Sequence, residues 1–192
     1  MSLTSLFMEL ADVFVGPQAI ETHSRDALQR AAAGARYSGP TIDLPEPFVQ
    51  VMSASDAHPL CKLIAGTRLL WTPPTTSADE QYVKHSACKV HVELLGPGGL
   101  VKSDQVRLGL YGMLPDSEYG IRTHPAEELY IMLAGEAYWK RGDLPYTLHG
   151  SGERSYHPSM MEHGTRTGSL AFMSVYMWYG DISTDNYVYS GV

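Results

Sequence analysis

The sequence predicts a mainly β protein in which a small barrel follows an N-terminal helical region. Over the first third of the chain, apolar residues recur at steps of three and four, the period of an amphipathic helix. After about residue 85, apolar and polar residues alternate, and turns rich in glycine and proline separate the alternating runs. We therefore expect residues 1–80 to form helices that pack on a barrel made by residues 81–192.

The first helix is expected within residues 3–14, where six apolar side chains fall on one stripe. They are Leu3, Leu6, Phe7, Leu10, Val13 and Phe14. A second helix should begin near Pro17 and end at Gly34, because proline suits the first turn and glycine the position after the last. Three prolines in residues 37–47 indicate a connection. We expect a third helix from about residue 48 to His58.

Four segments of the second part are expected to be strands. They read "CKVHVELL", "VRLGLYGML", "EELYIMLAGEAYW" and "LAFMSVYMWY". Within the third, residues 128–133 are largely apolar on both faces, with Leu129, Ile131 and Leu133 on one of them. A strand buried on both sides needs a cover over its outer face. The N-terminal helices are expected to provide that cover.

The composition and charge indicate which kind of protein this is and which binding partners are plausible. The 192 residues suit one domain, and 44% apolar with 18% charged residues is typical of a globular chain. A formal net charge of -7 argues against nucleic acid or an anionic membrane surface as partner and leaves a zwitterionic or carboxylate small molecule plausible. No apolar run approaches the roughly 20 residues of a membrane span. The opening residues also lack the basic and apolar regions of a signal peptide, so we expect a cytoplasmic protein.

The stretch "RTHPAEELYIMLAG" places a carboxylate in an apolar strand close to a histidine. A buried carboxylate must be paired, neutralised or bound to a metal. His124 lies four residues before Glu128, and His163 follows downstream. A bound metal ion is therefore the simplest way to compensate the buried charge of Glu128. Two histidines and one carboxylate leave coordination positions open, which suits one catalytic divalent transition metal such as Zn, Fe or Mn. A buried, hydrogen-bonded trio without a metal is the structural alternative.

These segments resemble the two motifs of the cupin superfamily. The matching positions are His124, Glu128 and Gly135 in the first motif and Gly152, Pro158 and His163 in the second. Arg122 occupies the position at which the motif usually has its first histidine. One of the usual metal ligands is therefore missing. The resemblance implies a small cupin barrel, a double-stranded β-helix, which is a fold that hosts many reactions.

A narrower resemblance is to the cupin-type lyases of dimethylsulfoniopropionate (DMSP), of the DddQ type. It is carried by Tyr119, His124, Glu128 and Tyr130, by "LAGEAYW" and "HPSM", and by His163. The resemblance implies metal-dependent β-elimination of DMSP to acrylate and dimethyl sulfide. It also implies that Tyr130 is the base and a conditional fourth metal ligand, with Tyr119 as the rival base.

The substrate is expected to contact Arg122, Tyr119 and Trp178. A guanidinium binds a carboxylate through two hydrogen bonds, and the faces of aromatic rings attract a sulfonium cation. The other histidines, His91 and His157 among them, are expected to be surface or capping residues, although His157 lies close to the second motif.

Two other functions remain open at this point. The same donor set suits a non-haem iron dioxygenase. The loss of one usual ligand at Arg122 instead favours a non-catalytic cupin that binds a small ligand.

Overall fold

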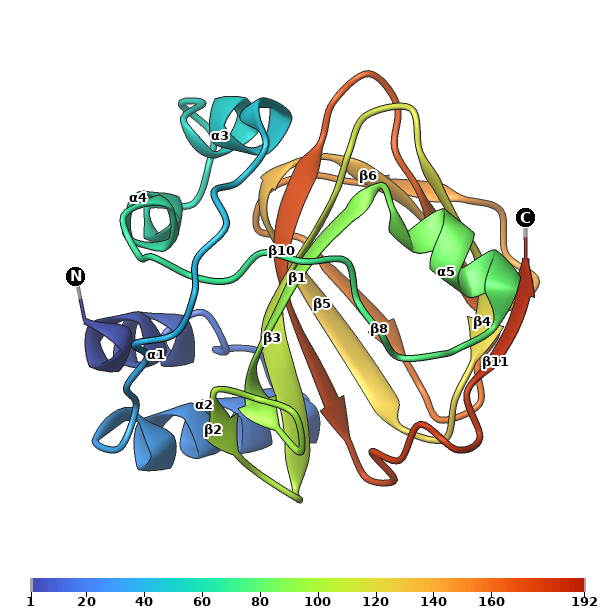
Figure 1. Ribbon diagram of the computed structural model, residues 1–192. Helices are drawn as coiled ribbons and strands as arrows, with labels where there is room; N and C mark the ends of the chain where they lie inside the picture. The colour runs from blue at the N-terminus through green and yellow to red at the C-terminus, as the bar shows by residue number, and fades with distance from the viewer. Residues whose placement is uncertain (1, 192) are drawn as a thin grey trace.

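The computed structural model describes residues 2–191 and confirms a mainly β protein with helices ahead of the barrel (Figure 1). The helices are α1 (Leu3–Ala11), α2 (Ala19–Ala32), α3 (Glu46–Met52), α4 (Leu60–Ala65) and α5 (Glu80–Ser86). The strands are β1 (Lys89–Gly96), β2 (Val101–Lys102), β3 (Val106–Met113), β4 (Glu118–Thr123), β5 (Glu127–Gly135), β6 (Ala137–Arg141), β7 (Thr147–His149), β8 (Arg154–His157), β9 (His163–Arg166), β10 (Phe172–Tyr179) and β11 (Val188–Gly191). Within residues 2–191, no helix is both long and apolar enough to cross a membrane.

The strands form two sheets that face each other across the barrel. One has six strands in the order β2-β1-β3-β10-β5-β8, and the other has five in the order β11-β4-β9-β6-β7. Helices α1 to α4 gather on one side of the barrel, whereas α5 lies beside β4 and β11 (Figure 1). This arrangement leaves one face of the six-stranded sheet against the helices and the other face inside the barrel.

Strand β5 is buried on both faces, as the sequence predicts. Leu129, Ile131 and Leu133 belong to the apolar cluster that contains the helical side chains, and α3 and α4 contact this strand. Tyr130 and Met132 belong to a second cluster inside the barrel. Burying each large apolar side chain contributes about 1.5–3 kcal/mol, so the helices that cover β5 are part of the core.

The first two helices lie where the periodicity predicts them. The side chain of Ser2 caps α1 by accepting a hydrogen bond from the backbone N–H of Ser5 at 3.2 Å. The whole predicted stripe is buried, including Val13 and Phe14 beyond the last turn. Gly34 follows the end of α2, as expected.

The helix expected from about residue 48 is present, but it ends well before His58. Helix α3 ends at Met52, and the hydroxyl of Ser53 donates to the backbone oxygen of Val49. Pro59 then stands at the start of α4, where the missing N–H of proline has no cost. Helix α5 was missed, although Asp79 caps it by accepting from the backbone N–H of Tyr82 at 2.9 Å.

The segment "EELYIMLAGEAYW" makes two strands rather than one. Gly135 has a φ of 68°, and a Cβ at this position would lie 2.0 Å from the backbone oxygen of Ala171. The chain turns here from β5 in the six-stranded sheet to β6 in the five-stranded sheet. Glycine is therefore required where the chain passes between the two sheets.

Candidate metal centre and pocket

Three side chains from different elements converge inside the barrel. Glu128 projects from β5 in the six-stranded sheet, whereas His163 opens β9 in the five-stranded sheet and His124 directly follows β4. All three are buried, and their ligand atoms lie within 4.8 Å of one another. The Nε2 atoms of His163 and His124 lie 3.0 and 3.4 Å from Glu128 Oε2. The structure thus brings together the trio expected from the sequence.

Both imidazoles are held by backbone oxygens that leave the opposite nitrogen facing Glu128. His124 Nδ1 lies 3.0 Å from the oxygen of Ala126, and His163 Nδ1 lies 2.8 Å from the oxygen of Met161. A carbonyl oxygen only accepts, so each Nδ1 carries the proton and each Nε2 presents a lone pair. Two lone pairs that face a carboxylate repel it unless a cation lies between them.

The separations also fit a single ion. Bonds of about 2.1 Å to nitrogen and oxygen place neighbouring ligand atoms about 3.0 Å apart in an octahedron and about 3.4 Å apart in a tetrahedron. The observed distances of 3.0 and 3.4 Å lie within this range. His163 Nε2 is moreover buried without a hydrogen-bond partner within residues 2–191. The trio could therefore hold a divalent transition metal.

The protonation states are those that a metal site needs. Burial alone would raise the pKa of Glu128, but hydrogen bonds from His124, His157 and His163, made when the imidazole nitrogens that face the carboxyl carry a proton, outweigh burial and hold its pKa well below the usual range. Burial, followed by the charge of Arg122, lowers the pKa of His163 well below its usual value. At neutral pH the carboxylate is therefore anionic and the imidazole of His163 is neutral.

Trp178 orients the carboxylate from its other side. Its Nε1 donates to Glu128 Oε1 at 2.5 Å, which leaves Oε2 to the imidazoles. The indole also stacks on His124, with ring centroids 4.1 Å apart. Trp178 therefore lies against the candidate metal-binding side chains while also lining the cavity.

His157 also lies at this centre, so the expected surface or capping role for it is wrong. It stands directly opposite Glu128 in the β5–β8 pair and is fully buried. Its Nδ1 lies 3.5 Å from Glu128 Oε2. The alternation of Ser155 and His157 toward the interior of β8 was the available signal, but a strand of four residues carries too few periods to be recognised.

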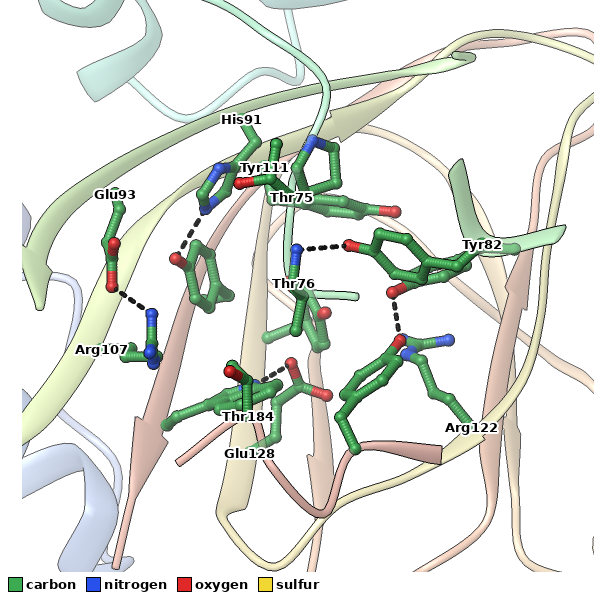
Figure 2. A pocket seen from close by; sticks show the side chains of 16 residues that line it. Thr75, Thr76, Tyr82, His91, Glu93, Arg107, Tyr111, Arg122, Glu128 and Thr184 are labelled. Atoms are coloured by element: carbon green, nitrogen blue, oxygen red, sulfur yellow. Dashed lines mark hydrogen bonds and ion pairs between the residues drawn. The ribbon is translucent and has the colours of Figure 1, made fainter. Parts of the chain in front are cut away.

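A cavity of about 170 Å³ opens next to the trio, and aromatic rings make up much of its wall. The aromatic residues are Tyr82, Tyr111, Tyr119, Tyr130, Tyr176, Trp178 and Tyr187. Figure 2 shows Glu93, Arg107 and His91 on one side of the cavity and Arg122 with Tyr82 on the opposite side. Glu128 faces the space between them. The cavity suits a small molecule with a cationic and an anionic part.

Arg122 supplies buried positive charge on one wall. It pairs with His163 across the β4–β9 ladder and is 1% exposed. Its guanidinium reaches the oxygen of Gly120 and the hydroxyl of Thr165 only at 3.4 Å. No ion pair within residues 2–191 includes it. Arg122 therefore has donors left for an anionic group in the cavity.

Tyr119 lies against the guanidinium of Arg122 and the amine of Lys89. The guanidinium carbon of Arg122 is 4.0 Å from the centroid of its ring, and Lys89 Nζ is 3.1 Å from it. Lys89 is itself 2% exposed. Burial, helped by the charge of Arg122, lowers the pKa of Lys89 to about 6. Its amine is therefore largely neutral at pH 7.

The tyrosines of the cavity differ in the partners of their hydroxyl groups. Tyr119 bonds to the hydroxyl of Tyr187, and Tyr176 lies 2.7 Å from His91 Nε2. His91 thus lines the cavity, contrary to the expected surface role. Burial raises the pKa of Tyr130 well above its usual value, and the charge of Glu128 raises it further. Tyr130 is a neutral phenol unless a nearby cation compensates for these effects.

Comparison with known proteins identifies similar chains. A family model described as dimethylsulfoniopropionate lyase matches residues 55–173. Dimethylsulfoniopropionate lyase DddQ of Ruegeria pomeroyi is 34% identical over 129 residues, which are 67% of this chain and 62% of that enzyme. The match therefore spans somewhat less than two thirds of the relative.

Solved structures agree over almost the whole chain. The crystal structure of DMSP lyase DddQ from Ruegeria pomeroyi DSS-3 superposes with a TM-score of 0.63 at 25% identity and covers 97% of this chain and 96% of that one. A chain from the crystal structures of the DMSP lyases RdDddP and RnDddQII gives a TM-score of 0.63 at 20% identity, with 97% of each chain covered. This second likeness concerns the fold alone.

Proposed function

The chain belongs to the dimethylsulfoniopropionate lyase family, and from this premise we propose that it cleaves DMSP by metal-dependent β-elimination. The products would be acrylate and dimethyl sulfide. The observation that carries the proposal is the buried trio of His124, Glu128 and His163, which faces a small aromatic cavity with an unpaired arginine on its wall.

The cavity has a partner for each part of this substrate. Arg122 is the donor for the substrate carboxylate, since its guanidinium has two weak hydrogen bonds to give up. The face of Trp178 borders the same space and suits the sulfonium cation, whereas the ring of Tyr119 lines the cavity but already lies against Arg122 and Lys89. These contacts would set the orientation of a short zwitterionic substrate between the two walls of the cavity.

His124, Glu128 and His163 would hold one divalent ion, which we expect to be Zn, Fe or Mn. When bound, the ion supplies Lewis acidity that makes the C–H bond next to the substrate carboxylate more acidic. Tyr130 is a conditional fourth ligand, because it lies on the Glu128 face of β5. Trp178 keeps the Glu128 carboxylate oriented through Oε1.

The base we propose is Tyr130. Its phenolate oxygen takes the proton from the carbon next to the carboxylate, and the electron pair of that C–H bond forms the double bond of acrylate. The carbon–sulfur bond breaks, and its electron pair leaves on sulfur as dimethyl sulfide. Because burial and Glu128 raise the pKa of Tyr130, the positive charge of the loaded site is needed to make the phenolate available. Tyr119 is the rival base, since it borders the same cavity.

The test is incubation of the metal-loaded protein with DMSP, followed by headspace analysis for dimethyl sulfide and chromatography for acrylate. We expect the two products in equal amounts, with and without oxygen. His163→Ala protein, depleted of metal, is the control and should be inactive. Turnover that requires oxygen would indicate a dioxygenase. Binding of DMSP without consumption would indicate a non-catalytic cupin, for which Arg122 in place of a ligand is the supporting observation.

A further inference from the structure

Tyr187 lines the cavity without a role in the proposed function. It lies just ahead of β11, and its ring is nearly parallel to those of His124 and Trp178, with planes 9° and 18° apart and centroids 6.0 and 6.2 Å apart. The ring of Tyr82 packs against it edge-on, with centroids 5.6 Å apart. Packing on several sides therefore fixes the direction in which the hydroxyl of Tyr187 points.

The hydroxyl groups of Tyr187 and Tyr119 are hydrogen-bonded to each other. Both residues line the cavity, and in the part of the chain that the structure describes neither hydroxyl has a second hydrogen-bond partner. A phenol carries one proton and keeps it at neutral pH. The pair therefore has two protons and uses one of them in its own bond, so one O–H is left without an acceptor.

The guanidinium of Arg122 lies over the ring that carries half of this pair. Its carbon is 4.0 Å from the centroid of the Tyr119 ring, and Arg122 lines the same cavity. Charge-assisted hydrogen bonds to a carboxylate are about 2.5–2.9 Å long from either kind of donor. A carboxylate that is bound to Arg122 through one oxygen can therefore accept from the hydroxyl pair through the other.

We propose that Tyr187 is a further substrate-binding residue, which together with Tyr119 presents one O–H to the substrate carboxylate beside Arg122. The inference rests on the proposed function and deepens it, because it adds a donor to the carboxylate subsite. Either hydroxyl can supply the free proton. When Tyr119 donates within the pair, Tyr187 donates to the substrate, and rotation of the two hydroxyl groups reverses these roles. The subsite therefore keeps its donor as long as one of the two hydroxyls is present.

The structural alternative is that the bond only ties the segment before β11 to β4. The two alternatives predict different results for single substitutions. If the bond is only a tie, removing either hydroxyl breaks it completely, and removing the second hydroxyl has no further effect. If the pair donates to the substrate, the remaining hydroxyl still presents its proton, and only removal of both abolishes the contact.

Calorimetric titration of acrylate into the metal-loaded protein tests this. Acrylate has the carboxylate but no leaving group, so its binding does not depend on which tyrosine is the base. We expect Tyr187→Phe and Tyr119→Phe each to bind acrylate within about threefold of wild type, because one O–H remains. The double variant should bind acrylate about 10–100-fold more weakly, which is the effect of losing a hydrogen bond to a charged acceptor.

The matched control is Tyr189→Phe. The ring of Tyr189 also stacks on Tyr119, but its hydroxyl is bonded to His85 and to the backbone N–H of Gly120. This control should bind acrylate within about twofold of wild type. Metal content and melting temperature are measured for every variant, since phenylalanine keeps each ring and its packing.

Three results would overturn the inference. The first is a loss of about tenfold or more in either single variant, equal to that of the double variant, because the bond would then be only a tie. The second is wild-type affinity in the folded double variant. The third is a wild-type protein that releases dimethyl sulfide from DMSP but does not bind acrylate. A wild-type protein that neither binds acrylate nor releases dimethyl sulfide would overturn the proposed function as well.

Discussion

Replacing Lys89 with methionine should stabilise the protein at neutral pH. Lys89 is buried at the start of β1, where Nζ contacts the hydroxyl of Ser86 at 3.3 Å and lies over the rings of Tyr119 and Tyr82. Burial and Arg122 lower its pKa from the ordinary value of 10.5 to about 6. The folded protein must therefore release, at pH 7, a proton that the unfolded chain retains.

The size and sign of this effect follow from proton linkage. Each unit of pKa shift is worth about 1.4 kcal/mol, and the 3.5 units between pH 7 and 10.5 give an upper bound of about 5 kcal/mol. Methionine fills a similar volume but forfeits the bond to Ser86, worth about 1 kcal/mol. We expect a net gain of about 2–4 kcal/mol at pH 7. Between pH 6 and 10.5 the unfolded wild type binds more protons than the folded one, so wild-type stability rises with pH there.

Urea unfolding of wild type and Lys89→Met at pH 7 and pH 9 measures both quantities. The advantage of the variant should shrink by about 3 kcal/mol between the two pH values, because only wild type gains stability from deprotonation. Lys84→Met is the matched control at an exposed position of α5 and should leave stability within about 0.5 kcal/mol at both pH values. A variant that is less stable than wild type at pH 7, or an advantage that does not change with pH, would refute the reasoning.

Three other outcomes can be measured with single substitutions. Arg122→His should tighten binding of Zn²⁺ by about tenfold or more in chelator competition, because it restores a lone pair near the trio; an unchanged affinity would mean that residue 122 does not reach the donors. At equal metal content, Tyr130→Phe should lower the elimination rate by about 10²–10⁴-fold, and by more than Tyr119→Phe does; the reverse ranking would transfer the role of base to Tyr119. Leu129→Ala should lower the free energy of unfolding by about 2–5 kcal/mol in urea because it opens a cavity beneath the helices; metal affinity should stay within twofold, because this side chain lies on the face of β5 away from the site.

The sequence predicts best the elements that are long and buried on a defined face. Helices α1 and α2 and strands β1, β3 and β10 each span several periods of their pattern, so their apolar stripes are visible without knowledge of the fold. Helix α5 and strands β7, β8, β9 and β11 span only three to seven residues and carry too few periods. The division of the chain near residue 80 stays a prediction, and α5, just beyond it, contacts β4 and β11.

The residues of the candidate site also differ in how well the sequence predicts them. His124, Glu128 and His163 follow a motif spacing that can be read along the chain. His157 and His91 were missed because their contacts depend on which strands lie across from one another. The first reaches Glu128 only through the pairing of β8 with β5, and the second reaches Tyr176 only because β3 brings β1 and β10 into one sheet. Such pairings join residues that are far apart in sequence.

The side chains of the candidate metal centre are divided between the two sheets of the barrel. Glu128 belongs to the six-stranded sheet, whereas His163, and His124 at the end of β4, belong to the five-stranded one. An ion held by all three would cross-link the sheets, as a disulfide does in a secreted domain. At a free concentration a thousand times its Kd, such an ion adds about 4 kcal/mol to the stability of the folded state. A chelator would therefore lower the melting temperature as well as the proposed activity.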